Sequence, residues 1–137
     1  MSKNIEIIHR FFDALERLDL DAVSEFFTED GIYHDIPVPT DPTVGREGIR
    51  KKLELVANAT DRLEMQLSSV IGEGDTVMTE RVEIWHFPTG ERPRLPVMSI
   101  FEMKDGRIAA WREYWDLNML MSQLPPDYLE ALSNIEM

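Results

Sequence analysis

The chain lacks cysteine entirely, and it has few basic residues. Without cysteine, disulfide bonds, thiolate nucleophiles and cysteine-ligated zinc or iron–sulfur sites are excluded. The 14 lysine and arginine residues face 26 acidic ones, which gives a formal net charge of −12. Nucleic acids and anionic membrane surfaces bind positive patches, so we expect neither as a partner. The simplest interpretation of the acidity is a solvated, charged surface.

Long apolar runs and several catalytic motifs are absent as well. No segment approaches the roughly 18 apolar residues of a membrane-spanning helix, and residues 1–6 lack the apolar core of a signal peptide. We therefore expect a cytoplasmic protein. The three histidines do not have the spacing of a metal site, so no metal ion is expected. Neither a phosphate-binding glycine loop nor a glycine-framed nucleophilic serine occurs.

The 137 residues are enough for a single domain, residues 1–137, with a substantial core. Apolar periodicity predicts helices over residues 4–17, 21–27, 46–58 and 126–134. Strand patterns separated by turn residues occur at 31–36, 65–72, 76–87, 94–104 and 107–117, with a turn expected at 28–31. Helices followed by a meander of antiparallel strands predict an α+β fold, in which a curved sheet wraps over the N-terminal helices as a cone with an internal pocket. The three prolines of 37–45 predict an extended loop that, with the tail 126–137, closes over that pocket.

Two of the expected strands carry ionisable residues among large apolar ones. Successive side chains of a strand point to opposite faces, so Arg81 and Glu83 share one face with Thr79 and Trp85. By the same alternation Glu113 lies on one face with Trp111 and Trp115. If both faces line a common cavity, Arg81 lies between two carboxylates, and buried charges of this kind persist only when paired, often at sites that do chemistry. The pattern predicts an acid/base site or, alternatively, a surface charge ladder across the strands.

Glu113 ranks first among the candidate catalytic residues. Desolvation among indole rings raises the pKa of a carboxyl group unless a nearby cation keeps it ionised. Arg81 could be that cation, because a guanidinium can bridge two carboxylates, one remaining a base while the other keeps its proton as an acid. Tyr33 and Asp35 share a face of the first strand and could hold a water or a substrate oxygen. A core aromatic and a strand-end residue are the plainer interpretations of these two.

These segments resemble limonene-1,2-epoxide hydrolase and its relatives in the nuclear transport factor 2-like superfamily, which also holds ketosteroid isomerase and the SnoaL-type polyketide cyclases. The resemblance runs from the first helix to about residue 117. It rests on Tyr33-x-Asp35-x-Pro37, Thr-Glu-Arg-Val-Glu at 79–83, Asp-Gly-Arg-Ile at 105–108 and Trp-Arg-Glu-Tyr-Trp-Asp-Leu at 111–117. It implies the cone fold above and a homodimer formed through the outer face of the sheet.

The resemblance also implies an enzyme that hydrolyses a small apolar epoxide to a diol in one step, with no covalent intermediate and no metal or organic cofactor. Matching positions make Glu113 the base that deprotonates water, Glu83 the acid that protonates the epoxide oxygen and Arg81 the bridge. Tyr33 would hold the water, and Asp35 is a further candidate for that role. We expect the apolar substrate to contact a set of pocket residues, namely Trp111, Trp115, Trp85, Val97 and Met78.

Three positions depart from that family, and two other functions stay open. Both family aspartates are glutamates here, and the family asparagine is Asp35, so one arginine faces three acids and at least one proton should be retained at neutral pH. The first alternative is an isomerase or cyclase that moves a proton next to a carbonyl group. Its oxyanion tyrosine would belong to the first helix, where this chain has Phe11 and Phe12. The second alternative is a non-catalytic pocket that binds an apolar ligand.

Overall fold

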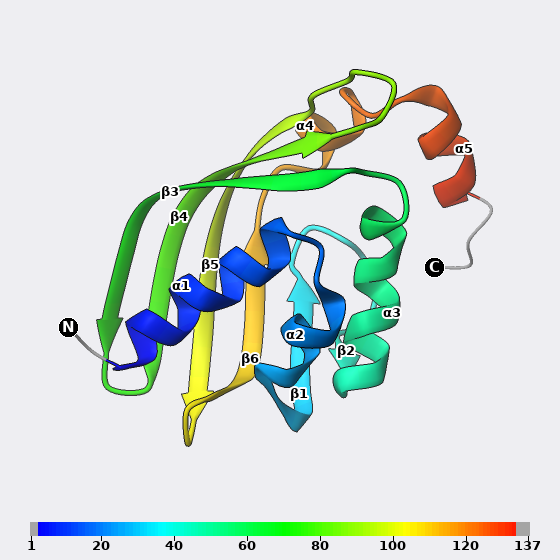
Figure 1. Cartoon of the computed structure of the whole chain (residues 1–137). Coiled ribbons are helices and arrows are strands. Elements are labelled where there is room, and N and C mark those ends of the chain that lie inside the picture. Colours follow the sequence, from blue (N-terminus) through cyan, green and yellow to red (C-terminus); the bar gives the residue numbers. More distant parts are fainter. Residues whose placement is uncertain (1–2, 134–137) are drawn as a thin grey trace.

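A strongly curved sheet surrounds the first helix in the computed structural model, which describes residues 3–133 (Figure 1). The helices are α1 (Lys3–Glu16), α2 (Leu20–Glu25), α3 (Arg46–Ala57), α4 (Leu117–Met121) and α5 (Pro126–Ser133). The strands are β1 (Phe27–Asp35), β2 (Thr43–Val44), β3 (Arg62–Glu73), β4 (Thr76–His86), β5 (Arg94–Lys104) and β6 (Arg107–Tyr114), in the spatial order β2-β1-β6-β5-β4-β3. The sheet is curved but not closed, and the expected α+β class is confirmed.

Helix α1 fills the concave side of the sheet with one apolar face. Its three-and-four spacing buries a continuous stripe, consisting of Ile7, Ile8, Phe11, Phe12, Ala14 and Leu15. Phe11 contacts the rings of Phe27, Phe101 and Trp111 edge-on, at centroid distances of 5.0–5.8 Å. Each buried aromatic side chain of this kind contributes roughly 1.5–3 kcal/mol. The stripe therefore fixes α1 against β1, β5 and β6, the strands that flank the polar cluster described below.

The pairing of β1 with β6 is parallel, whereas the sequence predicts antiparallel pairing throughout. The register aligns Asp35 with Glu113, which brings two acidic residues from distant parts of the chain side by side. A parallel pair needs a long crossover, here most of the domain, so local patterns carry no trace of it. Strand β1 also starts earlier than expected, at Phe27, because the predicted turn at 28–31 is part of the strand, where the register with β6 shifts between Phe27 and Ile32.

The C-terminal part of the chain differs from the expectation in one element. Strand β6 ends at Tyr114 rather than continuing to residue 117, and α4 follows it. The carboxylate of Asp116 accepts a hydrogen bond from the backbone N–H of Met119 at 2.9 Å, which is an N-cap that stabilises the start of a helix. Helix α5 agrees with the predicted tail helix up to Ser133, and residue 134 lies outside the described residues. None of the helices in the described range is long and apolar enough to cross a membrane.

Candidate active site

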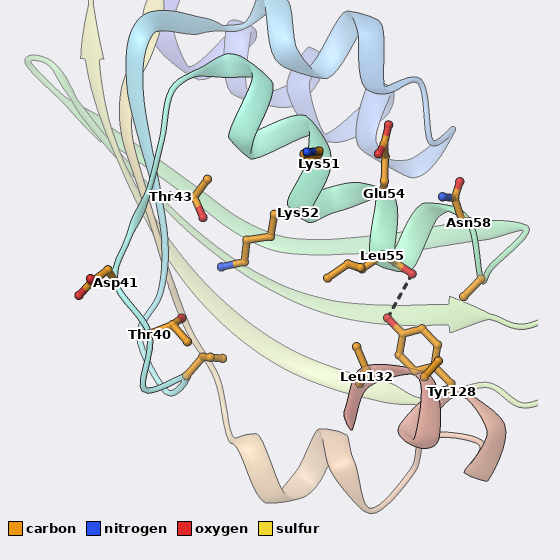
Figure 2. Close-up of a pocket in the computed structure, with 13 residues that line it drawn as sticks. Thr40, Asp41, Thr43, Lys51, Lys52, Glu54, Leu55, Asn58, Tyr128 and Leu132 are labelled. Carbon is orange, nitrogen blue, oxygen red and sulfur yellow. Dashed lines mark hydrogen bonds between the residues drawn. The ribbon is translucent and has the colours of Figure 1, made fainter. Parts of the chain in front are cut away.

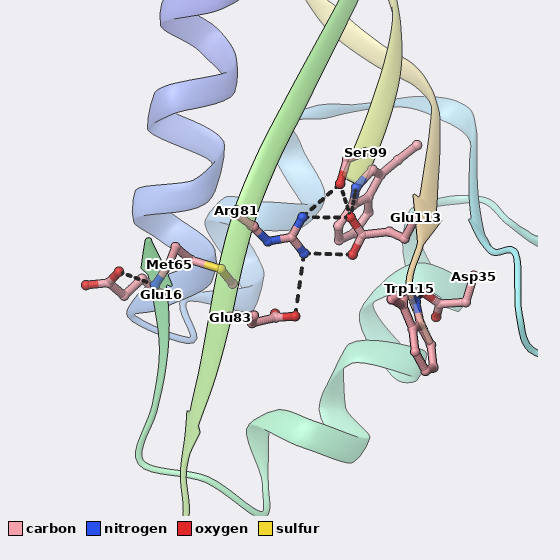
Figure 3. Close-up of polar contacts among 9 residues, drawn as sticks. Glu16, Asp35, Met65, Arg81, Glu83, Ser99, Glu113 and Trp115 are labelled. Carbon is pink, nitrogen blue, oxygen red and sulfur yellow. Dashed lines mark hydrogen bonds and ion pairs between the residues drawn. The ribbon is translucent and has the colours of Figure 1, made fainter. Parts of the chain in front are cut away.

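The centre of the site is a two-pronged ion pair between Arg81 of β4 and Glu113 of β6 (Figure 3). Arg81 Nη1 donates to Glu113 Oε2 at 3.0 Å and Nη2 donates to Oε1 at 2.9 Å. Arg81 is 1% exposed and Glu113 is 4% exposed. Burial tends to lower the pKa of Arg81, but the negative charges of Glu113 and Glu83 outweigh it and raise that pKa further. The guanidinium is therefore a permanent buried cation held in one orientation.

Glu113 accepts two more hydrogen bonds, both on Oε2. The indole Nε1 of Trp111 donates at 2.9 Å, and the hydroxyl of Ser99 donates while it accepts from Arg81 Nη1 at 2.8 Å. A carboxylate oxygen has about two lone-pair sites. Oε2 receives three donors and is fully used, whereas Oε1 receives Arg81 Nη2 alone among the described residues. Oε1 is therefore the oxygen of Glu113 that retains an acceptor site for a further proton donor.

Glu83 lies on the other side of the same guanidinium, in a much looser contact. Its Oε2 is 3.5 Å from Arg81 Nη2, and the residue is 8% exposed. Burial raises the pKa of Glu83 to about 7; Arg81 opposes this shift, and the charges of Glu113 and Asp35 add to it. Near neutral pH this carboxyl group therefore exists in both protonation states. Arg81 thus lies between two carboxyl groups. Glu113 accepts several hydrogen bonds, and Glu83 can give a proton.

Tyr33 and Asp35 complete the inward side of β1. The Tyr33 ring stacks on Trp111 at 4.1 Å, and burial, with the Asp35 charge second, raises its pKa well above the usual range, so the hydroxyl keeps its proton. Asp35 Oδ1 accepts from Trp115 Nε1 at 2.9 Å, and Oδ2 forms an ion pair with Lys52 Nζ of α3 at 3.0 Å. Trp115 follows the end of β6 and still reaches the cluster.

A cavity of about 860 Å³ lies beside this cluster, between α3, α5 and the loop after β1 (Figure 2). The loop 37–45 lines it as predicted, through Val38, Thr40, Asp41 and Thr43. Helix α5 supplies Tyr128 and Leu132, and the Tyr128 hydroxyl donates to the carbonyl of Leu55 at 3.4 Å. Lys52 is the residue that both lines the cavity and contacts the cluster. The buried ionic group of Arg81, Glu83 and Glu113 is not part of the wall of this cavity.

The five predicted substrate-contacting residues do not lie together in one pocket wall in the structure. Trp111 and Trp115 donate to the carboxylates of the cluster, and Val97 is buried opposite Arg81 in the β4–β5 register. Trp85 packs against Tyr128, with ring centroids 6.1 Å apart. Met78 lies on the opposite face of the sheet and is 46% exposed, so its placement in the pocket is wrong. Strand alternation already separates Met78 from Thr79 and Arg81.

Two residues of the cluster escape the sequence analysis, Ser99 and Lys52. Ser99 has a signal, since it is the polar member of an inward-facing alternation with Val97 and Phe101 on β5. Lys52 has none, because its approach to Asp35 depends on how α3 packs against β1. Within residues 3–133 no group of three or more histidine and acidic side chains has a geometry suited to a metal ion. Three buried polar atoms in that range, Arg81 Nε, Thr79 Oγ1 and Trp85 Nε1, have no hydrogen-bond partner in the protein.

The fold is an open, curved sheet over helices, and its interior holds a buried arginine between two acids. The chain belongs to the SnoaL-like domain family, whose family model matches residues 8–111. It is 27% identical over 112 residues to the epoxide hydrolase EphG of Mycobacterium tuberculosis (strain ATCC 25618 / H37Rv), which covers 80% of this chain and 71% of that protein. The expected resemblance to epoxide hydrolases of the limonene-1,2-epoxide hydrolase type is confirmed.

Solved structures agree with this assignment at the level of fold. An LEH-like epoxide hydrolase of M. tuberculosis superposes with a TM-score of 0.76 at 25% identity, covering 96% of this chain and 95% of that one. The epoxide hydrolase/cyclase-like enzyme SalBIII gives 0.74 at 22% identity, covering 85% and 92%. A SnoaL-like polyketide cyclase of Shewanella putrefaciens CN-32 gives 0.79 at 14% identity, covering 90% and 86%. The last two establish the shared fold alone.

Proposed function

We propose that the protein hydrolyses a small, mostly apolar epoxide to a diol by direct attack of water. The observation that carries this proposal is the single guanidinium of Arg81 shared by Glu113 and Glu83. Epoxide opening needs a base for the incoming water and an acid for the departing oxygen at the same moment. Glu113 Oε1 has the free acceptor site for the first task, and Glu83, with its pKa near 7, has the proton for the second.

The proposed step is balanced in atoms and protons. Glu113 takes a proton from water, the water oxygen bonds to an epoxide carbon, the carbon–oxygen bond of the ring breaks, and Glu83 gives its proton to that oxygen. Tyr33 keeps its hydroxyl proton and is suited to hold the water. After the step Glu113 carries a proton and Glu83 is ionised, and Arg81 lies between them as the proton returns. No covalent enzyme intermediate and no metal ion takes part.

The test is diol formation from terpene, cyclohexene and styrene epoxides in ¹⁸O-labelled water. We expect the wild type to give diols with one label, and we expect Glu113→Gln and Glu83→Gln to give none above background. Substitution of the exposed Glu102, on the outward side of β5, by Gln provides a matched control and should leave turnover unchanged. A wild type that turns over no epoxide, or a Glu113→Gln variant with full activity, would refute the proposal.

A second function uses the same groups without water. The related SalBIII has a role in pyran ring formation in the polyether salinomycin. The free site on Glu113 Oε1 suits a hydroxyl group of the substrate as well as it suits water, and attack by that hydroxyl would close a cyclic ether. Unlabelled cyclic ethers from hydroxy-epoxides in the same assay would favour this function. The isomerase alternative gains no support, since Phe11 and Phe12 occupy the core where its tyrosine would be needed.

We further propose that the protein is a homodimer through the outward face of the sheet. Four neighbouring strands expose large apolar side chains there: Ile71 is 68% exposed, Met78 46%, Met98 43% and Tyr114 47%. Cross-strand pairing aligns Ile71 with Met78, Met78 with Ile100, and Met98 with Tyr114, so apolar pairs extend over these strands. Exposed apolar patches on a soluble surface commonly mark interfaces. Light scattering should give twice the chain mass of 15.9 kDa for the wild type and a shift toward the monomer for Met98→Lys.

A further inference from the structure

Lys52 connects the cavity to the buried cluster. It lies on α3 with its side chain 26% exposed, and its Nζ is 3.0 Å from Asp35 Oδ2 and 4.4 Å from the centroid of the Tyr33 ring. Figure 2 shows the side chain extending from α3 toward the loop that carries Thr40 and Thr43. A molecule bound in the cavity would therefore contact this ammonium group.

The hydrogen-bonding capacity of Lys52 is only partly used. An ammonium group has three N–H donors, and the ion pair with Asp35 is the one contact of Lys52 with an oxygen within residues 3–133. The Tyr33 ring provides a cation–π contact rather than a hydrogen-bond acceptor. The other oxygen of Asp35 accepts a hydrogen bond from Trp115 Nε1, so Lys52 shares this carboxylate with a second donor. The Asp35–Lys52 pair is therefore neutral overall, and it presents N–H donors to the cavity.

The charges around the cavity favour a neutral ligand. Two lysines of α3, Lys51 and Lys52, are matched by Asp41 and Glu54 in the same wall, and Asp35 lies directly behind Lys52. No excess of positive charge is left to attract an anion, and the chain as a whole carries −12. The remaining wall is mostly apolar, with Leu55 and Leu132 among its members, and Asn58 adds an uncharged polar group. The cavity is thus suited to an apolar body with one uncharged acceptor oxygen.

We propose that Lys52 binds substrate, donating a hydrogen bond from Nζ to a neutral oxygen of an otherwise apolar molecule in the cavity. The proposal rests on the proposed function for the identity of that oxygen, which would be the epoxide oxygen or a second oxygen of the same substrate. Binding itself depends only on the cavity and on Lys52. The substrate class is accordingly an uncharged, mostly apolar oxygenated molecule, and neither a carboxylate nor a pure hydrocarbon.

Three probes of nearly equal shape separate these classes: menthone, menthane and menthanecarboxylate. Dissociation constants for the full chain are measured by ligand-detected NMR, with no turnover involved. We expect menthone to bind about tenfold more tightly than menthane or menthanecarboxylate, which is the size of one hydrogen bond to a charged donor. Lys52→Met should remove this preference and Lys52→Arg should keep it. Lys51→Met, on the neighbouring lysine of the same wall, should not change it.

Each result decides the proposal. Tighter binding of menthanecarboxylate, or an unchanged menthone preference in folded Lys52→Met, would overturn it. If Lys52→Met does not fold, the ¹⁵N ammonium resonance of Lys52 in the wild type is followed during a titration with menthone. The Lys52 resonance should shift, and that of Lys51 should not. A Lys52 resonance that stays in place would also overturn the proposal. If the epoxide assay fails but the preference for menthone depends on Lys52, the proposed hydrolase function is rejected and the proposed binding site is retained. If epoxides are hydrolysed but the preference for menthone does not depend on Lys52, only the proposed binding site is rejected.

Discussion

The two sides of the Arg81 guanidinium contain the same residue type in very different surroundings. On one side Glu113 accepts four hydrogen bonds, from Arg81 Nη1 and Nη2, Ser99 and Trp111. On the other side Glu83 has one ion-pair contact at 3.5 Å, and its pKa is raised to about 7 by burial. Both groups are buried and both face one cation. The two carboxyl groups therefore differ chiefly in how they are held, with four hydrogen bonds at Glu113 against a longer ion-pair contact at Glu83.

Removing the shared cation should have the largest effect. In Arg81→Met both carboxylates lose their counter-ion in a buried place, and breaking one side of such a pair costs about 3–5 kcal/mol. Denaturant unfolding followed by circular dichroism should show this loss of unfolding free energy, together with loss of turnover. Arg81→Lys should rescue only part of it, because an ammonium group cannot form the bidentate contact. A loss below about 1 kcal/mol for Arg81→Met would mean that the cluster is not held by this charge.

Replacing the two glutamates one at a time tests the comparison itself. Each Gln variant should lose roughly 10²- to 10⁴-fold in kcat, the usual contribution of a general acid or base. The stabilities of the two variants should differ. In Glu113→Gln an amide N–H₂ group faces N–H and O–H donors that need an acceptor, whereas in Glu83→Gln the amide resembles the protonated carboxyl group. We expect a cost of about 1–3 kcal/mol for Glu113→Gln and little change for Glu83→Gln. Equal costs in urea unfolding would remove the distinction between the two sides.

The raised pKa of Glu83 predicts how stability depends on pH. The folded protein holds this proton up to about pH 7, whereas the unfolded chain releases it near the ordinary value of 4.5. Between these values the folded state binds more protons, so the stabilisation from this group is complete below about 4.5 and is lost as the pH rises to about 7. Melting temperatures measured between about pH 4.5 and pH 7 should include a decrease with rising pH that comes from Glu83. Glu83→Gln should remove that contribution, and an unchanged slope in the variant would contradict it.

The smallest expected effect concerns Ser99. Ser99→Ala removes one donor from Glu113 Oε2 and one acceptor from Arg81 Nη1, at a cost of about 1–2 kcal/mol. Because Trp111 and Arg81 still hold Glu113, the fold should remain intact. Ser99→Thr keeps the hydroxyl and should recover most of the lost stability. A Thr variant as unstable as the Ala variant would mean that packing, and not the hydroxyl, is what Ser99 contributes.

Local patterns predict most of the fold, and they do so for a physical reason. The amphipathic stripe of α1 and the alternation along β4 and β5 are properties of consecutive residues, so their existence follows from the sequence. The parallel β1–β6 pair depends on contacts between segments about eighty residues apart, which no local window contains. The end of β6 is missed for a subtler reason, since the Asp116 cap favours a helix within a run of apolar residues.

In the candidate site too, features that depend on consecutive residues can be predicted, and features that depend on packing between distant segments cannot. Alternation predicts that Arg81 and Glu83 share a face and that Glu113 shares one with Trp111 and Trp115, and the resemblance adds the roles of base, acid and bridge. The prediction misplaces Met78 even though alternation excludes it from the pocket, and it overlooks Ser99 although alternation reveals it. Lys52 could not be predicted, because its contact with Asp35 is made by the packing of α3. Protonation is predictable only in general terms, as one retained proton, while its assignment to Glu83 depends on which carboxylate the donors surround.

The most direct test of the acid and base assignment is the titration of glutamate side chains labelled with ¹³C at the carboxyl carbon. NMR spectra of the wild type, Glu83→Gln and Glu113→Gln would be recorded from acidic to mildly alkaline pH. We expect one buried carboxyl resonance that titrates near pH 7 in the wild type and is missing in Glu83→Gln. A titration near pH 7 that persists in Glu83→Gln and disappears in Glu113→Gln would contradict the assignment, because it would exchange the acid and the base.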